Sequence, residues 1–280
     1  MIINQEVSFI KQNSLFEHIE LCGKNAYKSE KSIKDGTADL FIKRILSSKH
    51  YSVLEHGSIY IVIDPSKSDN YANCYDFIEF FSVNPYSKIY FDDDKDSQKY
   101  YITTNMRVIV ENSYLIDIKN YIFEGTKIPK YIKVLESPTK KHELRFTFRI
   151  ITDQKIAQEI VRHRQGSYTI ESTRWCNYKN KPLSFINIKD HLKNKLSQYI
   201  YKFMTVLSEK AYILLINLHE RPEIARSLLL NGTKADVIMT MSDSQWDAFF
   251  KLRMAKDAHP LINEVASEIY KTINDIKSSM

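Results

Sequence analysis

The chain has 280 residues, of which 43% are hydrophobic and 12% aromatic, so it can build the core of a globular protein. Its 40 basic residues exceed its 34 acidic ones for a net charge of +6, and without a long basic block this balance favours small anionic ligands at least as much as nucleic acid. No apolar run approaches the roughly 18 residues that cross a bilayer, and no signal peptide opens the chain, so we expect an intracellular, cytoplasmic protein.

The first half of the chain mixes helix and strand patterns. Residues 38–48 have the apolar spacing of a helix, residues 49–57 form a turn that contains Glu55 and His56, and residues 58–64 alternate as a strand. Residues 64–104 are rich in Asp, Ser, Asn and Tyr, which is typical of a long, insertion-like excursion on the surface. A strand or a helix begins around Asn105, and residues 141–152 alternate as a strand of a sheet.

The second half is mainly helical. Ile156 and Ile160 predict a helix that is capped by Thr152 or Asp153 and has residues 162–164 as its last turn. Leucines and other apolar residues recur at helical spacing over 191–218, so we expect this helix to be core scaffold. A short helix opens at Pro222, and residues 242–273 form two helices separated near 259–260. Residues 1–280 are therefore expected to form a single α+β domain, with a central, mostly antiparallel sheet flanked by helices.

The densest polar cluster is residues 162–174, RHRQGSYTIESTR, which holds three Arg, one His, two Ser, two Thr and one Glu. Successive helical residues lie about 100° apart, so Arg162, His163 and Arg164 point in different directions and contact more than one group. If the chain is extended from Thr169 onward, Ser172 and Arg174 lie on one side, an arrangement that suits a phosphate or the polar edge of a base. The alternative interpretation is a helix C-terminus whose cations offset the helix dipole.

Other constellations leave alternatives open. Arg226 and Arg253 lie in apolar helical patterns, where each needs either a structural carboxylate partner or a phosphate. His56 fits a general base, a cofactor contact or a cap, whereas the arginines beside His163 favour its neutral form. Three cysteines without a CxxC pair and eight histidines without a ligand spacing give no indication of a metal site or a disulfide framework. The chain also has no P-loop, no GxGxxG segment and no recognisable nucleophile.

The motifs resemble those of one known family. Arg162-His163-Arg164, followed after seven residues by Ser172, is similar to the signature of the flavin-dependent thymidylate synthases. Leu54-Glu55-His56 also resembles a motif of this family, and so do the stretches CGKNAYKSE, TTNMR, STRWCNY, EIARSLLL and FFKLR. All these matches together cover about half of the chain.

The resemblance implies an activity and a set of site residues. The family converts dUMP to dTMP with methylene-tetrahydrofolate as carbon donor, FAD as hydride carrier and NADPH as reductant, in a homotetramer whose sites lie between subunits. By resemblance, FAD would be bound by Arg162, His163 and Arg164, with His56 near the flavin ring. The residues expected to bind dUMP are Glu159, Ser172, Arg174, Arg226 and Arg253. Ser172 and Arg253 are the expected catalytic residues, which polarise the substrate rather than attack it.

Some positions depart from the family pattern. Ile170 stands where members often have Gln or Glu, Glu159 where a Gln is frequent, and Trp175 where Tyr is common. Leu261 and Asn263 replace a more usual Glu and Arg, which leaves the role of His259 open. Two rival hypotheses are a nucleic-acid-binding protein that uses residues 162–174, with Tyr168 or Trp175 stacking on bases, and a catalytically silent homologue that binds flavin and nucleotide.

Overall fold

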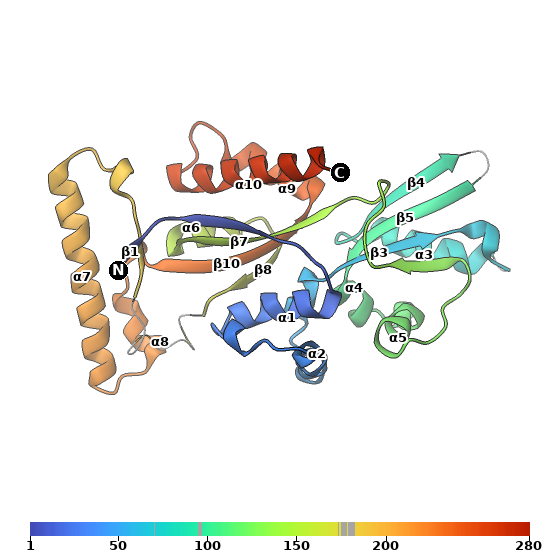
Figure 1. The fold of residues 1–280 in the computed structure, drawn as a ribbon, viewed down its shortest axis with the longest axis horizontal. Helices are drawn as coiled ribbons and strands as arrows, with labels where there is room; N and C mark the ends of the chain where they lie inside the picture. Colours follow the sequence, from blue (N-terminus) through green and yellow to red (C-terminus); the bar gives the residue numbers. More distant parts are fainter. Residues whose placement is uncertain (70, 95–96, 173, 175–177, 179–182) are drawn as a thin grey trace.

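The computed structural model describes residues 1–280 except 70, 95–96, 173, 175–177 and 179–182. Its strands form two four-stranded antiparallel sheets and one parallel pair, and helices pack around them (Figure 1). This arrangement confirms the predicted α+β class. Among the described residues, no helix is both long and apolar enough to span a bilayer.

The central sheet has the order β2-β7-β10-β8. Its strands are β2 (Glu6–Ile10), β7 (Arg145–Asp153), β8 (Ser167–Ile170) and β10 (Lys234–Ser242). One face packs against α6 (Gln154–Ile160), α9 (Asp243–Arg253) and α10 (Pro260–Ser278) around the buried Trp246, and α1 (Leu15–Asn25) lies on the other face (Figure 1). Side chains of β10 alternate between these two environments, as strand geometry requires.

The lateral sheet, β4-β5-β3-β6, has a separate core. Its strands are β3 (Ser58–Ile63), β4 (Lys88–Asp94), β5 (Ser97–Asn105) and β6 (Ile132–Leu135). The helices around this core are α2 (Thr37–Ser48), α3 (Tyr71–Val83), α4 (Met106–Glu111) and α5 (Ile116–Glu124). The expectation of a surface excursion over residues 64–104 is wrong, because the segment supplies α3, β4 and β5 and buries Phe81 and Ile102. The polar residues of this segment belong to a helix and strands that bury their other side chains, and not to a loop.

The remaining elements form one end of the molecule (Figure 1). Strands β1 (Ile2–Ile3) and β9 (Phe185–Ile186) pair in parallel, and α7 (Lys195–Asn217) and α8 (Pro222–Ala225) follow.

Short 3-10 helices are distributed along the described part of the chain. They are η1 (Glu30–Ser32), η2 (Tyr51–His56), η3 (Pro65–Lys67), η4 (Ser113–Leu115), η5 (Lys189–His191) and η6 (Arg226–Leu228).

The helix over residues 195–217 is confirmed, but the prediction that its apolar stripe is core is wrong. Leu196, Ile200, Phe203 and Leu214 are 55 to 68% exposed, whereas Thr205, Ser208, Tyr212 and Ile216 are the buried residues. The helix therefore packs on the chain through a mixed side, on which Tyr212 and Ile216 join a small core with Phe185 and Ala225. We name its outward apolar side the α7 stripe, whose exposed members are Leu196, Tyr199, Ile200, Phe203, Val206, Leu207, Leu214 and Leu218.

Helix termini explain where several predicted boundaries fall. Asp153 caps α6 by accepting a hydrogen bond from the Ile156 amide at 2.7 Å, which confirms one of the two predicted caps. Helix α6 ends at Ile160, and residues 162–164 form a turn beyond it. The expectation that these residues are the last turn of the helix is therefore wrong. The break at 259–260 is confirmed, because Pro260 opens α10 after the cap His259.

Candidate functional site

The turn after α6 is closed by contacts to one carbonyl oxygen. The His163 carbonyl accepts hydrogen bonds from the Gly166 amide at 2.9 Å and from the Tyr168 hydroxyl at 2.6 Å. A Cβ atom on Gly166 would lie 2.4 Å from the Tyr168 hydroxyl oxygen, so a larger residue there would have to displace the Tyr168 ring. The turn thus fixes the directions in which residues 162–165 leave the backbone.

Arg253 from α9 reaches the same turn. Its Nε donates to Nε2 of His163 at 2.9 Å, while Nη1 donates to the Glu159 carboxylate at 3.0 Å and Nη2 to the Glu159 carbonyl at 2.8 Å. The predicted need of Arg253 for a partner is thereby met within the chain, and two residues expected to bind substrate bind one another. The structure brings Arg253 to Glu159 and His163, from which the sequence separates it by 94 and 90 positions.

The contact with Arg253 determines the protonation of His163. Burial, and then the charge of Arg253, lower the pKa of His163 to about 4, so the ring is neutral at pH 7. Because Nε2 accepts the hydrogen bond from Arg253, the proton lies on Nδ1. A neutral His163 was also expected from the sequence. The charge that lowers its pKa, however, is that of Arg253 and not that of the neighbouring Arg162 and Arg164.

Arg162 and Arg164 differ from Arg253 in their environment. Both side chains are exposed, and among the described residues no carboxylate pairs with either guanidinium. Exposed guanidinium groups that are unneutralised beside a fixed turn can accept an anionic group without first breaking an ion pair. The two predicted flavin-binding arginines are therefore available for a ligand.

Ser172 and Arg174 follow β8 and leave the region of Arg253. The Ser172 amide donates to the Ala26 carbonyl at 2.9 Å, which ties this segment to the end of α1. The Arg174 side chain is 56% exposed, and its Nε lies 3.2 Å from the carboxylate of Glu223 at the start of α8. Trp175 and Cys176 lie outside the described residues.

Arg226 lines a cavity of about 430 Å³ between α6 and the segment from α8 to Asn231. Glu223, the partner of Arg174, lines it too, as do Gln154 and Gln158 on α6. Residues 158 and 159 point about 100° apart on the helix, and Glu159 is turned to Arg253 instead. Within one chain, the predicted substrate residues thus form two groups on different sides of α6: Glu159 with Arg253, and Arg174 with Arg226.

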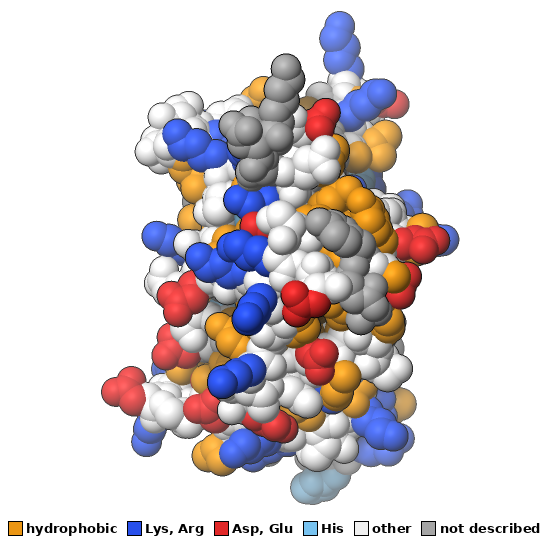
Figure 2. Space-filling model, turned by 90° about the vertical axis from the view of Figure 1, so that its right-hand side faces the viewer, with side chains coloured by type: hydrophobic (Ala, Val, Ile, Leu, Met, Phe, Trp, Pro, Cys, Tyr) orange, Lys and Arg blue, Asp and Glu red, His pale blue; other side chains and the backbone are white. Residues whose placement is uncertain are grey.

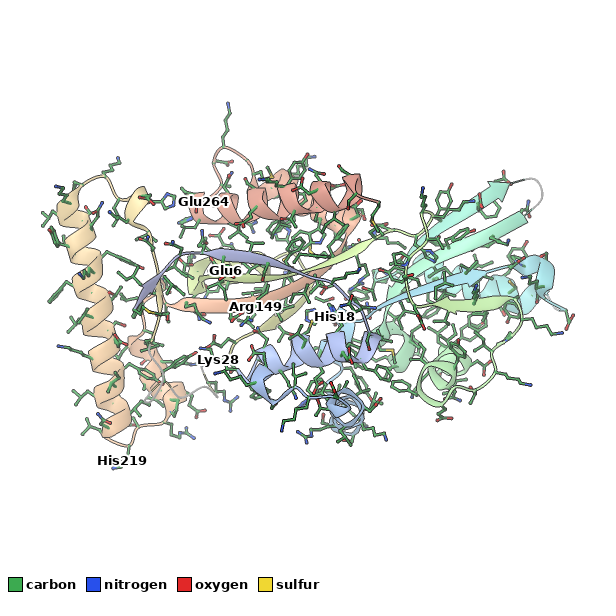
Figure 3. All side chains as sticks on the ribbon, viewed as in Figure 1. Glu6, His18, Lys28, Arg149, His219 and Glu264 are labelled. Carbon is green, nitrogen blue, oxygen red and sulfur yellow. The ribbon has the colours of Figure 1, made fainter. Side chains whose placement is uncertain are left out.

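A buried charge cluster lies beneath Ser172, and we did not expect it from the sequence. Glu171 is 4% exposed and pairs with Lys28 at 2.5 Å and Lys234 at 2.9 Å. Lys234 also lies 3.2 Å from Asp236, which binds Arg149 at 2.6 Å. Figure 3 shows Lys28 just past the end of α1 and Arg149 on the central sheet. The only sequence signal was the resemblance of CGKNAYKSE, which contains Lys28, to a family motif.

His56 lies inside the protein, with no exposed surface. Its Nδ1 is hydrogen-bonded to the Thr240 hydroxyl at 2.8 Å and its Nε2 to the Thr169 hydroxyl at 2.9 Å. The chain of contacts continues from Thr240 to Thr147 at 2.8 Å and from Thr147 to His18 at 3.1 Å. Within this chain, His56 therefore joins η2 to the central sheet and has no free nitrogen to offer a ligand.

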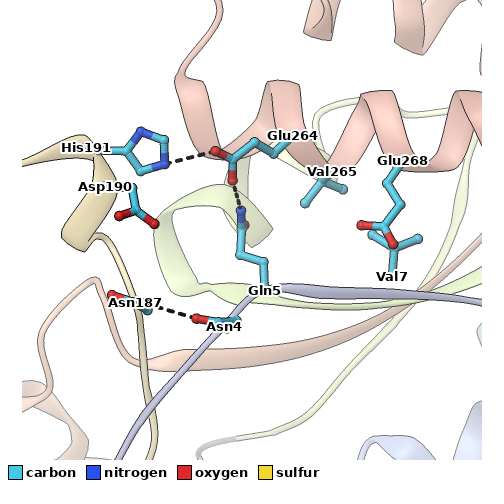
Figure 4. A pocket seen from close by; sticks show the side chains of 9 residues that line it. All are labelled: Asn4, Gln5, Val7, Asn187, Asp190, His191, Glu264, Val265 and Glu268. Atoms are coloured by element: carbon cyan, nitrogen blue, oxygen red, sulfur yellow. Dashed lines mark hydrogen bonds and ion pairs between the residues drawn. The ribbon is translucent and has the colours of Figure 1, made fainter.

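A further cavity, of about 290 Å³, lies away from all of these residues (Figure 4). Glu264 accepts a hydrogen bond from Gln5 at 3.0 Å and contacts His191 at 3.0 Å. Although Asp190 and Glu268 also line the cavity, no three His, Cys, Asp or Glu side chains of the described residues are grouped to hold a metal ion.

Comparison with known proteins places the chain in a family. Residues 130–277, more than half of the chain, match the family model described as thymidylate synthase complementing protein. Thymidylate synthase X from Helicobacter pylori, solved with FAD and dUMP, is 18% identical, with 45% of this chain and 66% of that chain covered and a TM-score of 0.38. The match thus spans slightly less than two thirds of that enzyme.

A second structure to which the chain is similar is that of PolB, a UMP/dUMP methylase from Streptomyces cacaoi solved with 5-Br dUMP. It is 12% identical, with 97% of this chain and 90% of that chain covered and a TM-score of 0.43. No curated protein matches the chain. On the match of the family model, the chain belongs to the thymidylate synthase complementing proteins, the flavin-dependent thymidylate synthase family that its motifs resemble.

Proposed function

We propose that the protein is a flavin-dependent thymidylate synthase, which converts dUMP to dTMP with methylene-tetrahydrofolate as carbon donor and NADPH as reductant. The family match over residues 130–277 carries this proposal, because it includes both groups of arginines around α6. The reduced FAD supplies the hydride when it is bound. The protein itself has to bind and orient the cofactor and the substrate, and to polarise the substrate.

The residues of the turn after α6 fit an FAD site. Arg162 and Arg164 are exposed and have no carboxylate partner among the described residues, so they can bind the pyrophosphate of the cofactor. His163 presents the edge of a neutral ring that carries its proton on Nδ1. His56 takes an indirect role in this proposal: it holds Thr169, and with it the strand that follows the turn, instead of contacting the flavin.

For dUMP we propose the side of α6 that carries Arg226. Arg174 and Arg226 would bind the phosphate, with Glu223 released from Arg174 when the substrate enters. Ser172 polarises the uracil, while the amide tie to Ala26 fixes its backbone. Arg253 and Glu159 complete the substrate site from another subunit in this proposal, since within one chain they face the other side of α6.

A homotetramer is supported by the α7 stripe. Phe203 is 65% exposed and Leu207 47% exposed, among other large apolar residues on one side of a long helix. Monomeric proteins rarely leave such a contiguous apolar surface in water, and a second copy offers the same surface by symmetry. Association through α7 would bring the neighbouring α8 and Arg226 close to another subunit.

Two measurements test the function. The purified protein should show a flavin absorbance spectrum, either as isolated or after addition of FAD, and should form dTMP from dUMP, methylene-tetrahydrofolate and NADPH. UMP is the matched comparison substrate, and its methylation at an equal rate would assign a different substrate range. A protein that takes up no FAD refutes the proposal, whereas FAD and dUMP binding without turnover identifies a catalytically silent homologue.

A further inference from the structure

The outer face of the lateral sheet has an unusual composition. Tyr90, Tyr101, Val62 and Lys133 are paired across adjacent strands, so they share the face that points away from the buried Ile61. Beside them lies a cavity of about 300 Å³. This end of the molecule faces the viewer in Figure 2, where Lys and Arg side chains gather along one side.

Four lysines surround that cavity. Lys67, Lys99, Lys130 and Lys133 line it, together with a single acidic residue, Asp64. Lys67 and Lys99 lie 3.6 and 3.8 Å from the Asp64 carboxylate, distances that are long for a strong ion pair. Among the described residues, no carboxylate lies within 4 Å of the Lys130 or Lys133 ammonium groups. The lining therefore carries an excess of three positive charges.

Asp64 remains ionised and in place. It is 7% exposed, its carboxylate accepts a hydrogen bond from Ser66 at 2.5 Å, and its amide donates to the Tyr131 carbonyl at 2.8 Å. Burial acts to raise the pKa of Asp64, but the Ser66 hydroxyl and the two lysines hold it below its ordinary value. The carboxylate thus attracts Lys67 and Lys99 through two long ion pairs and leaves Lys130 and Lys133 for a ligand.

We propose that this cavity binds a compact ligand that carries two or more phosphate groups, such as pyrophosphate or a nucleoside diphosphate. A phosphate monoester carries a charge of about −1.5 to −2 at pH 7, so two phosphate groups balance the excess charge better than one. Thr139 also lines the cavity, and Tyr101 supplies an aromatic wall. This site is separate from the dUMP and FAD sites proposed above.

The surroundings favour a compact ligand over a nucleic acid strand. The cavity volume is at the lower end of the roughly 300–1,000 Å³ of small-molecule sites. Towards β4 the same face continues into Asp92, which lies in the cross-strand row of Lys99 and is paired with Lys141. A polynucleotide that crossed the sheet would meet this carboxylate after leaving the lysines.

The test is a titration of the full chain with inorganic pyrophosphate, followed by calorimetry at low and at physiological salt. Replacement of two lysines by Lys130→Glu and Lys133→Glu should weaken binding at least about 10-fold, because the lining loses its charge excess. Asp64→Asn should change affinity in the opposite direction, towards tighter binding. The matched control is Lys127→Glu, since Lys127 is exposed and close in the chain but does not line the cavity.

Further arms separate the possible ligands. ADP binding more tightly than pyrophosphate would assign the natural ligand to nucleotides, and equal affinity would assign it to the phosphate groups alone; both results support the site. Unchanged pyrophosphate affinity in the double variant, or an equal loss in Lys127→Glu, overturns the proposal. It is also overturned if a single-stranded oligonucleotide binds more tightly than pyrophosphate and displaces it. Circular dichroism spectra of all variants exclude misfolding as the cause.

Discussion

Arg253 illustrates what a sequence reveals about a single charged residue. Its place in an apolar helical pattern correctly predicted that the guanidinium needs a partner, and left open whether that partner is a carboxylate or a phosphate. In the chain it binds Glu159 and His163. Residue 159 lies 94 positions away, so this pairing depends on how α9 meets α6, which no local pattern contains. The clustering of Arg162, Arg164 and Ser172, by contrast, was visible because those residues are neighbours in sequence.

The first residue-scale prediction concerns Arg174. Arg174→Ala should weaken dUMP binding by about 1.5–3 kcal/mol, or roughly 10- to 150-fold in Kd, because a hydrogen bond between charged groups is lost. Calorimetric titration with dUMP measures the effect. Arg221→Ala is the matched control, since Arg221 also pairs with Glu223, at 2.8 Å, and is 75% exposed. Equal dUMP affinities for wild type and Arg174→Ala would contradict the proposed role.

Glu171 gives a second prediction, on stability. Glu171→Gln leaves Lys28 and Lys234 beside a neutral amide, and should lower the free energy of unfolding by about 2–3 kcal/mol, since both lysines keep some solvent contact. Urea unfolding followed by fluorescence measures it. Glu264→Gln serves as the comparison: Glu264 is exposed, and its loss should cost less than about 1 kcal/mol. Similar losses of unfolding free energy in the two variants would show that the buried cluster contributes no more to stability than an exposed ion pair does.

At the scale of elements, apolar spacing predicted helices and strands correctly where the same chain buries one face of the element. Helices α9 and α10 were found because apolar spacing and Pro260 mark them. Strand β10 was not predicted: nearly all of its residues are buried, on both faces, so the polar alternation of a half-exposed strand is weak. For α7 the periodicity was correct but the side was wrong, because apolar spacing identifies a face that needs cover and not what covers it.

The α7 stripe leads to the third prediction. Phe203→Asp places a charge at the middle of the stripe and should shift the protein to smaller assemblies, with the loss of any activity that needs several subunits. Light scattering coupled to size-exclusion chromatography measures the mass. Lys202→Asp, at an exposed neighbouring position that is already polar, is the control and should leave the mass unchanged. A wild-type protein that is monomeric at micromolar concentration would remove the basis of the prediction.

At the scale of the whole molecule, composition and element patterns predicted the α+β class but not the separation into several cores. The two larger cores lie around Trp246 at one sheet and Phe81 at the other, and α1 and η2 connect them, while a smaller third core lies under α7. His18 on α1 and His56 on η2 take part in this connection through threonines of the central sheet. Whether the chain is one domain, as the sequence suggested, remains a prediction.

These two histidines predict sensitivity to acid. Burial, assisted by nearby positive groups, lowers the pKa of His56 to about 3 and that of His18 to about 4. An unfolded histidine has a pKa near 6.5, so below that pH the unfolded state gains a proton that the folded state refuses. Stability is therefore lost as the pH falls from 6.5 towards 4, by on the order of 2 kcal/mol for each histidine at pH 5.

Urea unfolding at pH 7 and pH 5 measures this loss. The variant His56→Gln keeps a donor and an acceptor for the two threonines but does not titrate, so its unfolding midpoint should depend less on pH than that of the wild type. His50→Gln, at an exposed position, is the control and should retain the full dependence. Equal midpoints of the wild type at the two pH values would count against neutral, buried histidines.

Strand β10 carries one consequence for how the site can change. Lys234, Asp236 and Thr240 occupy alternate positions of one face, so the charge cluster under Ser172 and the threonine bonded to His56 are spaced by strand geometry, with about 13 Å between positions 236 and 240. An insertion or deletion of one residue in this strand would exchange its polar face for Val237, Met239 and Met241. The length of the strand therefore sets the spacing of these contacts, and a change of length by one residue would remove them together.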